Sequence, residues 1–315
     1  MSDAVVFPGQ GAQKPGMGLD FVDAFPAAAA VFDEASEALS TDLRALVRGD
    51  DGRLGLTAWT QPALLTTCIA LYRAVLSEGG LHPRWFGGHS LGEYTALVAA
   101  GALELGAAVR IVHARGRAMQ DAVPPGDGAM AAILGEGVDA ALLRHLAPGV
   151  DLANLNAADQ LVLSGAASAV DAALAALAAH PVARAWRAVR LDVSAPFHSR
   201  WMAGIEPAFA ETLAAAAPAF TPARAAVVTS NFTGAFHTGD AAALRDALTR
   251  QISGPVRWVE NMQALRAQGP TRVVELGPGR TLRPFFRTVD TAVESVFNLV
   301  TARRLASAPA PGSPP

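Results

Sequence analysis

Gly88-His89-Ser90-Leu91-Gly92 decides the fold, because this stretch places a serine between two glycines where a short strand meets a helix. Residues 84–88 are partly apolar, and residues 91–100 contain no Pro and, after position 92, no Gly. Strand, tight turn and helix in this order form a nucleophile elbow, which holds a serine hydroxyl above a sheet. The sequence therefore predicts Ser90 as a nucleophile, with the Leu91 amide at a helix N-terminus facing a developing oxyanion. A Gly-rich turn in which Ser90 only caps the helix is the alternative.

A nucleophilic serine needs a general base, and the chain has seven histidines. His198 lies in a Pro-containing loop directly after the strand-like residues 187–193, and such loops commonly present catalytic groups. His89 adjoins Ser90, so its side chain is expected to point away from the serine hydroxyl. His237 lies in a polar loop and is expected to be solvated. The others expected to be structural or exposed are His82, His113, His145 and His180. His198 is therefore the predicted base.

Helix geometry singles out one arginine. Residues 103–123 are predicted to form a helix, and at about 100° per residue Arg115 projects into the edge of its apolar face, which Met119 shares. Arg110 and Arg117 project to the opposite side. A buried arginine must find an anion, and a guanidinium matches a carboxylate with two parallel hydrogen bonds. Arg115 is expected to bind an acidic group of a substrate, and an internal salt bridge is the alternative.

Composition excludes several classes of protein. The chain has 315 residues, of which 51% are hydrophobic and 17% are charged, as in a compact α/β protein with a sizeable core. A net charge of −3 argues against a nucleic-acid surface. The single cysteine, Cys68, excludes a disulfide framework and a cysteine-based metal cluster. With no long apolar span and no export signal at the start, we expect a cytoplasmic protein that does not contact membranes.

The order of predicted elements defines the fold class. A buried strand at 4–7 precedes the sharp turn Gly9-Gln10-Gly11, which lets the Gln10 amide face a ligand. Residues 1–126 and 195–304 are expected to form a large α/β-hydrolase-like domain with a short parallel sheet. Residues 127–194 read as βαββαβ, an inserted ferredoxin-like domain. The Ala/Ser/Pro-rich tail 305–315 is expected to be disordered.

The sequence also predicts individual helices and strands within these domains. Helices are expected at 20–48, 61–78, 138–146, 167–179 and 201–216. Strands are expected at 129–134, 151–156, 160–164, 185–193, 225–230 and 272–275.

Several motifs, in order along the chain, carry a family resemblance. They are Phe7-Pro-Gly-Gln-Gly-Ala-Gln13, Thr60-Gln-Pro-Ala63, Gly88-His-Ser-Leu-Gly-Glu-Tyr94, Arg115-Gly-Arg-Ala-Met-Gln120, Ala195-Pro-Phe-His198, Gly254-Pro-Val-Arg-Trp258 and Glu275-Leu-Gly-Pro-Gly279. Together they resemble the signatures of malonyl-CoA:acyl carrier protein transacylases, and they extend from about residue 4 to about residue 300. The acyltransferase domains of polyketide synthases share most of them.

The resemblance implies a role for each matching position. Ser90 would carry a malonyl ester, and His198 would act as general base and then as acid. The family has no carboxylate as third member, and a main-chain carbonyl, here that of Gln251, orients the histidine. Because this role uses only the main chain, Gln251→Ala is expected to do much less harm than Ser90→Ala or His198→Ala.

The substrate site follows from the same resemblance. The amides of Gln10 and Leu91 would form the oxyanion hole, and Arg115 would clamp the malonyl carboxylate. Phe197 would crowd the α-carbon of the acyl group and favour malonyl over branched units, with Met119 in the same site.

The implied function is transfer of malonyl from malonyl-CoA to an acyl carrier protein by a ping-pong mechanism, for fatty acid or polyketide synthesis. Neither cofactor nor metal is expected, and the protein is expected to be a monomer. A basic cluster that could meet an acidic carrier consists of Arg184, Arg187, Arg190 and Arg200. Ordinary solvated arginines are the alternative for these four residues. The alternatives are a thioester hydrolase on the same fold, an α/β-hydrolase using an acid such as Asp121, Asp127 or Asp192, and a carrier-binding module without catalysis.

Overall fold

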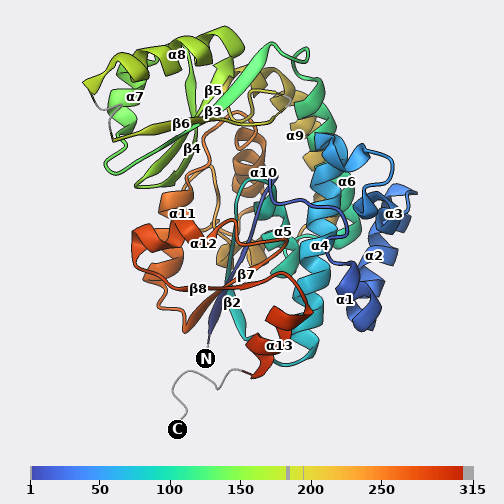
Figure 1. Cartoon of the computed structure of the whole chain (residues 1–315). Coiled ribbons are helices and arrows are strands. Elements are labelled where there is room, and N and C mark those ends of the chain that lie inside the picture. The colour runs from blue at the N-terminus through green and yellow to red at the C-terminus, as the bar shows by residue number, and fades with distance from the viewer. Residues whose placement is uncertain (1, 182–184, 194, 308–315) are drawn as a thin grey trace.

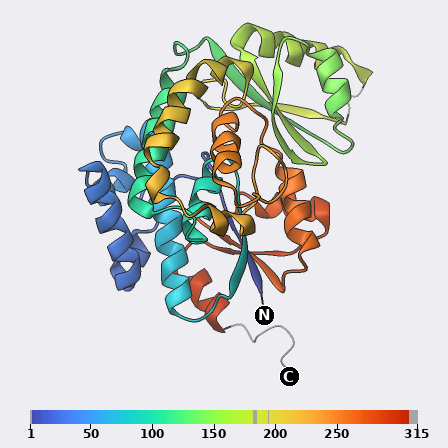
Figure 2. The same ribbon diagram turned by 180° about the vertical axis from the view of Figure 1, so that it is seen from behind.

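The computed structural model describes residues 2–181, 185–193 and 195–307, which contain two four-stranded sheets. The parallel sheet has the order β2-β1-β7-β8. Its strands are β1 (Asp3–Phe7), β2 (Pro83–Gly88), β7 (Arg272–Leu276) and β8 (Val293–Val296). The antiparallel sheet has the order β4-β5-β3-β6 and lies above the parallel one (Figures 1 and 2). This architecture confirms the predicted fold class.

Alternation along β1 explains why the parallel sheet is covered on both faces. Val5 and Phe7 pack in the core formed by the N-terminal helices, whereas Ala4 and Val6 pack against helices near the C-terminus. Successive side chains of a strand point to opposite faces, so a strand buried on both sides reads as a continuous apolar run.

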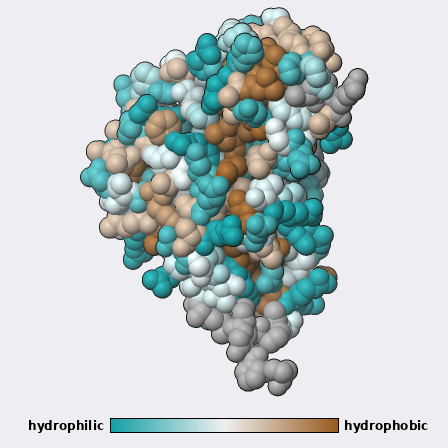
Figure 3. Space-filling model, turned by 90° about the vertical axis from the view of Figure 1, so that its left-hand side faces the viewer, coloured by the Kyte–Doolittle hydropathy of each residue, from teal (hydrophilic) through white to brown (hydrophobic). Residues whose placement is uncertain are grey.

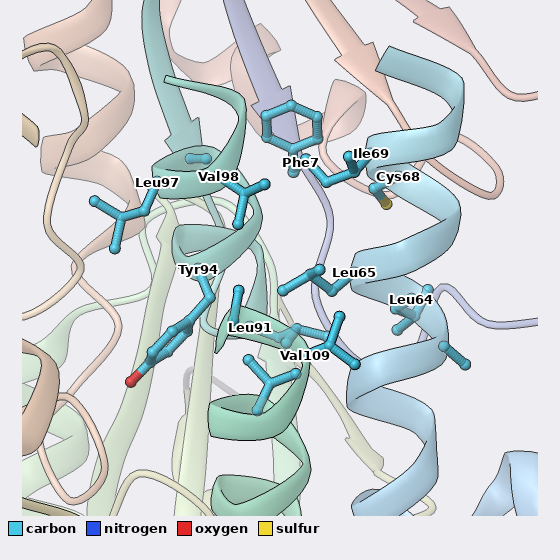
Figure 4. Packing of buried hydrophobic residues seen from close by; sticks show 14 of the residues in the cluster. Phe7, Leu64, Leu65, Cys68, Ile69, Leu91, Tyr94, Leu97, Val98 and Val109 are labelled. Carbon is cyan, nitrogen blue, oxygen red and sulfur yellow. The ribbon is translucent and has the colours of Figure 1, made fainter. Parts of the chain in front are cut away.

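Helices of the N-terminal part cover one face of this sheet. They are α1 (Leu19–Ala24), α2 (Pro26–Leu39), α3 (Leu43–Arg48), α4 (Thr57–Ser77), α5 (Leu91–Ala99) and α6 (Leu105–Asp121). Figure 4 shows Leu65 of α4 facing Leu91 of α5, with Val109 of α6 beside them and the Tyr94 hydroxyl pointing away from α4. This packing fixes the start of α5, and therefore the elbow, against α4 and α6.

Later elements complete the large α/β unit. Helices α11 (Trp258–Ala267) and α12 (Arg283–Phe286) cover the second face, and the remaining helices are α9 (Glu206–Ala215), α10 (Ala241–Arg250) and α13 (Leu299–Ser307). On the side of the molecule shown in Figure 3, hydrophobic residues gather in a band that runs down the middle of the view.

The antiparallel sheet belongs to the βαββαβ unit that the sequence predicted. Its elements are β3 (Gly128–Leu134), α7 (Ala140–Leu146), β4 (Asp151–Ala157), β5 (Gln160–Ala166), α8 (Ala167–Ala179) and β6 (Arg187–Arg190). Along β3, Ala131 and Ile133 pack against α7 and α8, whereas Met130 and Ala132 belong to the main core. One face of this sheet is therefore turned toward the large unit. The predicted domain boundaries at 126/127 and 194/195 stay predictions.

Some expected elements differ from the observed ones. The predicted helix 20–48 is three helices, because Pro26 starts α2 after an extended Phe25, Ser40 ends α2 in a left-handed conformation, and Asp42 caps α3. The predicted helix 201–216 begins as the 3₁₀ helix η3 (Arg200–Ile205) before α9. Strand β8 has only four residues and was not predicted.

The predicted strand 225–230 is wrong. Residues of that stretch form the end of a 3₁₀ helix, η5 (Pro222–Val227), which Pro222 starts. Beyond it, only isolated bridges join Val228 to Phe86 and Thr229 to Phe236. Tail residues 305–307 belong to α13 rather than to a disordered segment, and residues 308–315 lie outside the described part. No helix of the described ranges is long and apolar enough to cross a membrane.

Candidate active site

The elbow holds Ser90 in a strained conformation between β2 and α5. Its φ is 51° and its ψ is −103°, a combination that non-glycine residues rarely adopt. The two flanking glycines permit this turn, because a Cβ on Gly88 would lie 1.9 Å from the Gly92 carbonyl carbon, and one on Gly92 would lie 2.2 Å from the Phe7 carbonyl oxygen. The sharp, tightly packed turn predicted from the sequence is present.

The structure brings Ser90 and His198 together across the cleft. Ser90 Oγ lies 2.7 Å from His198 Nε2, and His198 Nδ1 lies 2.8 Å from the main-chain carbonyl oxygen of Gln251. A carbonyl oxygen only accepts, so Nδ1 carries the hydrogen and Nε2 is free to accept the serine proton. Among the described residues no carboxylate pairs with His198, which argues against the α/β-hydrolase triad.

Two physical effects keep His198 neutral. The imidazole is only 4% exposed, and the Arg115 guanidinium lies on the other side of the Ser90 hydroxyl. Burial first, and the positive charge of Arg115 second, lower the pKa of His198 to about 3. An unprotonated imidazole is the form that a general base requires.

Arg115 is buried, as its helix position predicts. Its side chain is 1% exposed, whereas Arg110 and Arg117 of the same helix are exposed. Its Nη2 donates to Ser90 Oγ at 3.1 Å, and its guanidinium lies 5.5 Å from the centre of the Tyr94 ring. In the part of the chain that the structure describes, Arg115 forms no ion pair and its Nε has no hydrogen-bond partner. Within the described residues, Arg115 therefore does not form the internal salt bridge that was the alternative.

A cavity of about 370 Å³ surrounds this group and lies between the two sheets. Gln10, Leu91, Met119 and Phe197 line it, as expected of substrate-site residues. Its other wall comes from the antiparallel sheet, through Met130, Ala132, Asn154, Asn156, Gln160 and Val162. The N–H groups of Gln10 and Leu91 form no hydrogen bond within the described residues, so both remain able to receive a ligand oxygen.

Two histidines differ in their surroundings. His89 lines the same cavity as Ser90 and His198, and its Nε2 lies 2.7 Å from Asn156 Oδ1 of β4. The expectation for His237 is wrong, because its side chain is buried and its Nε2 lies 2.9 Å from Glu93 Oε1. The loop that carries His237 folds back onto α5, which brings it to a partner 144 residues away.

The side chain of Gln251 is also more involved than expected. It is fully buried, its Oε1 accepts from Arg115 Nη2 at 2.9 Å, and its Nε2 donates to the Ser90 carbonyl at 3.0 Å and to Glu93 Oε2 at 2.7 Å. A side-chain substitution there removes several buried hydrogen bonds. The expectation that Gln251→Ala does much less harm than the changes at Ser90 and His198 did not take these bonds into account.

Sequence reasoning missed three buried polar residues around the serine. Gln61 contacts Arg115, Glu93 contacts Gln251, and the Asn231 side chain accepts from the Ser90 N–H and donates to the Gly88 carbonyl. Gln61 has the largest polar side chain in a long, charge-free stretch of α4, and a residue of that kind in that setting was an available signal. Asn231 gave no local signal, since its partners lie about 140 residues earlier.

Two of the four arginines of the predicted basic cluster form ion pairs. Arg190 pairs with Asp171, and Arg200 pairs with Asp151 at 2.6 Å. Arg187 is exposed, and Arg184 lies outside the described residues.

Comparisons with known proteins agree with this geometry. The family described as acyl transferase domain matches residues 4–302. The malonyl CoA-acyl carrier protein transacylase of Escherichia coli K12 is 42% identical over 301 residues, covering 94% of this chain and 95% of that protein.

Solved structures of transacylases are also similar to this chain. The crystal structure of malonyl-CoA:acyl carrier protein transacylase from Xanthomonas oryzae has a TM-score of 0.90 at 38% identity, with 98% of each chain covered. A malonyl-transacylase in complex with its type II PKS acyl-carrier protein has a TM-score of 0.88 at 37% identity, with 97% of this chain and 99% of that chain covered. The chain thus belongs to the malonyl CoA-acyl carrier protein transacylase family of acyltransferases.

Proposed function

We propose that the protein transfers malonyl from malonyl-CoA to the phosphopantetheine thiol of an acyl carrier protein through an ester on Ser90. One observation carries this proposal. Ser90 Oγ lies between a neutral imidazole, His198 Nε2 at 2.7 Å, and a buried cation that forms no ion pair with any described residue, Arg115 Nη2 at 3.1 Å. A base beside the nucleophile serves acyl transfer in general, and the cation beside it selects an acyl group that ends in a carboxylate.

In the first half-reaction His198 Nε2 takes the hydroxyl proton as Ser90 Oγ attacks the thioester carbonyl carbon. The carbonyl oxygen becomes an oxyanion, and the free N–H groups of Gln10 and Leu91 are placed to stabilise it. When the tetrahedral intermediate collapses, the carbon–sulfur bond breaks and His198 returns the proton to the departing thiolate. CoA leaves, and a malonyl ester remains on Ser90.

Arg115 holds the malonyl carboxylate during this step. Its side chain lines the cavity, and a carboxylate there can accept charge-assisted hydrogen bonds from the guanidinium. The carboxylate also compensates the positive charge that lowers the pKa of His198. Bound malonyl thereby raises the basicity of the imidazole at the moment when it must accept a proton. Phe197 and Met119, which line the same cavity, limit the room beside the acyl chain.

In the second half-reaction the carrier thiol replaces CoA. His198 takes the thiol proton, the thiolate attacks the ester carbonyl, and the carbon–oxygen bond to Ser90 breaks with return of the proton to Oγ. The related malonyl-transacylase that was solved with its acyl-carrier protein supports a carrier protein as the acceptor. A cytoplasmic setting and a monomeric state remain part of the proposal, and the buried free thiol of Cys68 agrees with a reducing compartment.

The test is intact-mass analysis after brief mixing with malonyl-CoA, followed by addition of holo-carrier. We expect a mass increase of one malonyl group on the protein, which then moves to the carrier. A protein that never forms the adduct is not a transacylase of this mechanism. Rapid loss of the adduct to water, with no gain by the carrier, would instead identify a thioester hydrolase.

A further inference from the structure

Two glutamines hold the two terminal nitrogens of Arg115. Gln61 Oε1, from α4, accepts from Nη1 at 2.9 Å, and Gln251 Oε1, directly after α10, accepts from Nη2 at 2.9 Å. Both glutamine side chains are buried, with 2% of Gln61 and none of Gln251 exposed. The guanidinium therefore has a fixed direction before any substrate arrives.

The amide groups of both glutamines are themselves oriented. Gln251 Nε2 donates to the Ser90 carbonyl and to Glu93 Oε2, both of which only accept in these contacts. Gln61 Nε2 faces the Met119 sulfur at 3.8 Å. With the NH₂ groups directed elsewhere, each glutamine presents its oxygen to Arg115.

The nearby carboxylate is kept away from Arg115. Glu93 is fully buried, and its oxygens accept hydrogen bonds from His237 Nε2, the Asn231 N–H and Gln251 Nε2. It forms no ion pair with Arg115 in the described part of the chain, because the Gln251 amide lies between them. A buried arginine ordinarily meets a carboxylate, and here it meets two neutral oxygens instead.

We propose that Gln61 and Gln251 are positioning residues for substrate specificity, which fix the direction of the Arg115 guanidinium while leaving it without a carboxylate in direct contact. The substrate carboxylate then supplies the missing counter-charge, and an acyl group without a carboxylate gains nothing from the site. This inference rests on the proposed malonyl transfer. A carboxylate in place of either amide oxygen would neutralise the guanidinium and compete with the substrate.

The direct test is Gln61→Glu, which keeps the shape of the side chain and adds the competing charge. Adduct formation on Ser90 is followed by intact mass with malonyl-CoA and, separately, with acetyl-CoA. We expect malonyl loading to fall by about 30-fold or more, as for loss of a charge-assisted contact, while acetyl loading stays within about threefold. Gln120→Glu, on α6 but outside the cavity, adds the same charge and should change neither rate.

A second variant covers the case in which Gln61→Glu does not fold, which thermal denaturation would reveal. Gln251→Ala removes the side-chain oxygen but keeps the main-chain carbonyl that orients His198. We expect malonyl loading to fall several-fold more than acetyl loading. Asn298→Ala is its control, since that amide bonds to Thr301 and does not line the cavity, and it should leave the ratio of malonyl to acetyl loading unchanged.

The outcomes separate the two proposals. If the unmodified protein forms no malonyl adduct, the proposed function fails. If it forms the adduct but folded Gln61→Glu keeps the malonyl preference, or loses malonyl and acetyl loading equally, the positioning role of the glutamines is wrong.

Discussion

The serine elbow has a front, which faces the cavity, and a back, which faces Glu93 and Asn231. The two sides contain similar polar groups but use them differently. In front, Arg115 keeps an unpartnered Nε, and the Gln10 and Leu91 amides have no partner within the described residues. Behind the turn, both oxygens of Glu93 and every polar atom of the Asn231 side chain are hydrogen-bonded. Hydrogen-bonding groups left unused beside a nucleophile are costly, so these donors on the cavity side indicate where a ligand binds.

The hydrogen-bonded back of the elbow also explains how the strained backbone of Ser90 persists. Asn231 accepts from the Ser90 N–H and donates to the Gly88 carbonyl, so it holds the elbow on both sides of the residue with φ of 51°. Asn261 in turn accepts from Asn231 at 2.9 Å. A network with all partners satisfied can hold a conformation that costs on the order of 1–3 kcal/mol.

The largest effect is expected from the reacting pair in front of the elbow. Ser90→Ala should abolish the malonyl adduct, because no other group occupies the position of its Oγ. His198→Ala should slow adduct formation by about 10²- to 10⁴-fold, the usual range for a general base. Intact mass with rapid quenching measures both. An adduct that formed on another residue of Ser90→Ala would show that the elbow is not the nucleophilic site.

The next largest effect concerns the cation in front of the elbow. Arg115→Ala should lower malonyl loading by about 30- to 1000-fold, equivalent to about 2–4 kcal/mol, with a much smaller loss for acetyl. The ratio of the two loading rates is the measurement. Arg117→Ala, exposed on the same helix, is the control and should leave the ratio unchanged. Loss of selectivity in Arg117→Ala instead would mean that the other side of α6 faces the substrate.

The front of the elbow could be predicted from the sequence and the back could not. Ser90 lies within a local strand–turn–helix pattern, and Arg115 is identified by the phase of a single helix. His237 pairs with Glu93 across 144 residues, and Asn231 follows a 3₁₀ segment that was predicted as a strand. Such pairings depend on tertiary contacts that periodicity does not encode, and for the same reason the side-chain role of Gln251 was missed.

A smaller effect, of a different kind, is expected from Glu93 behind the elbow. Glu93→Gln replaces an acceptor-only group that receives three N–H donors, so one donor should meet the new NH₂. We expect the free energy of unfolding to fall by about 1–3 kcal/mol. Malonyl and acetyl loading should change by similar factors, because an oxygen at position 93 can still accept from Gln251. Denaturant unfolding and the loading ratio test this, with exposed Glu211→Gln as the control.

A loss confined to malonyl loading in Glu93→Gln would contradict the division between the two sides. It would mean that the charge of Glu93 contributes to the clamp through Gln251, in addition to its structural bonds.

The smallest expected effect is a pH dependence of the folding stability, which arises from His198 on the front of the elbow. In the unfolded chain His198 binds a proton below its ordinary pKa of about 6.5, whereas in the folded protein its pKa is about 3. Between these values the unfolded state holds more protons, so His198 makes stability fall as the pH drops, by at most about 1.4 kcal/mol per pH unit. His89, whose pKa is also lowered by its enclosure, acts in the same direction.

Comparing variants isolates the contribution of His198. Unfolding by denaturant at about pH 7 and about pH 5 should show a smaller loss of stability in His198→Ala than in the unmodified protein, since that variant lacks the group whose protonation differs between the two states. His145→Ala, an exposed histidine of α7, should leave the slope unchanged. Equal slopes in all three proteins would mean that His198 titrates normally, and that burial beside Arg115 does not keep it neutral.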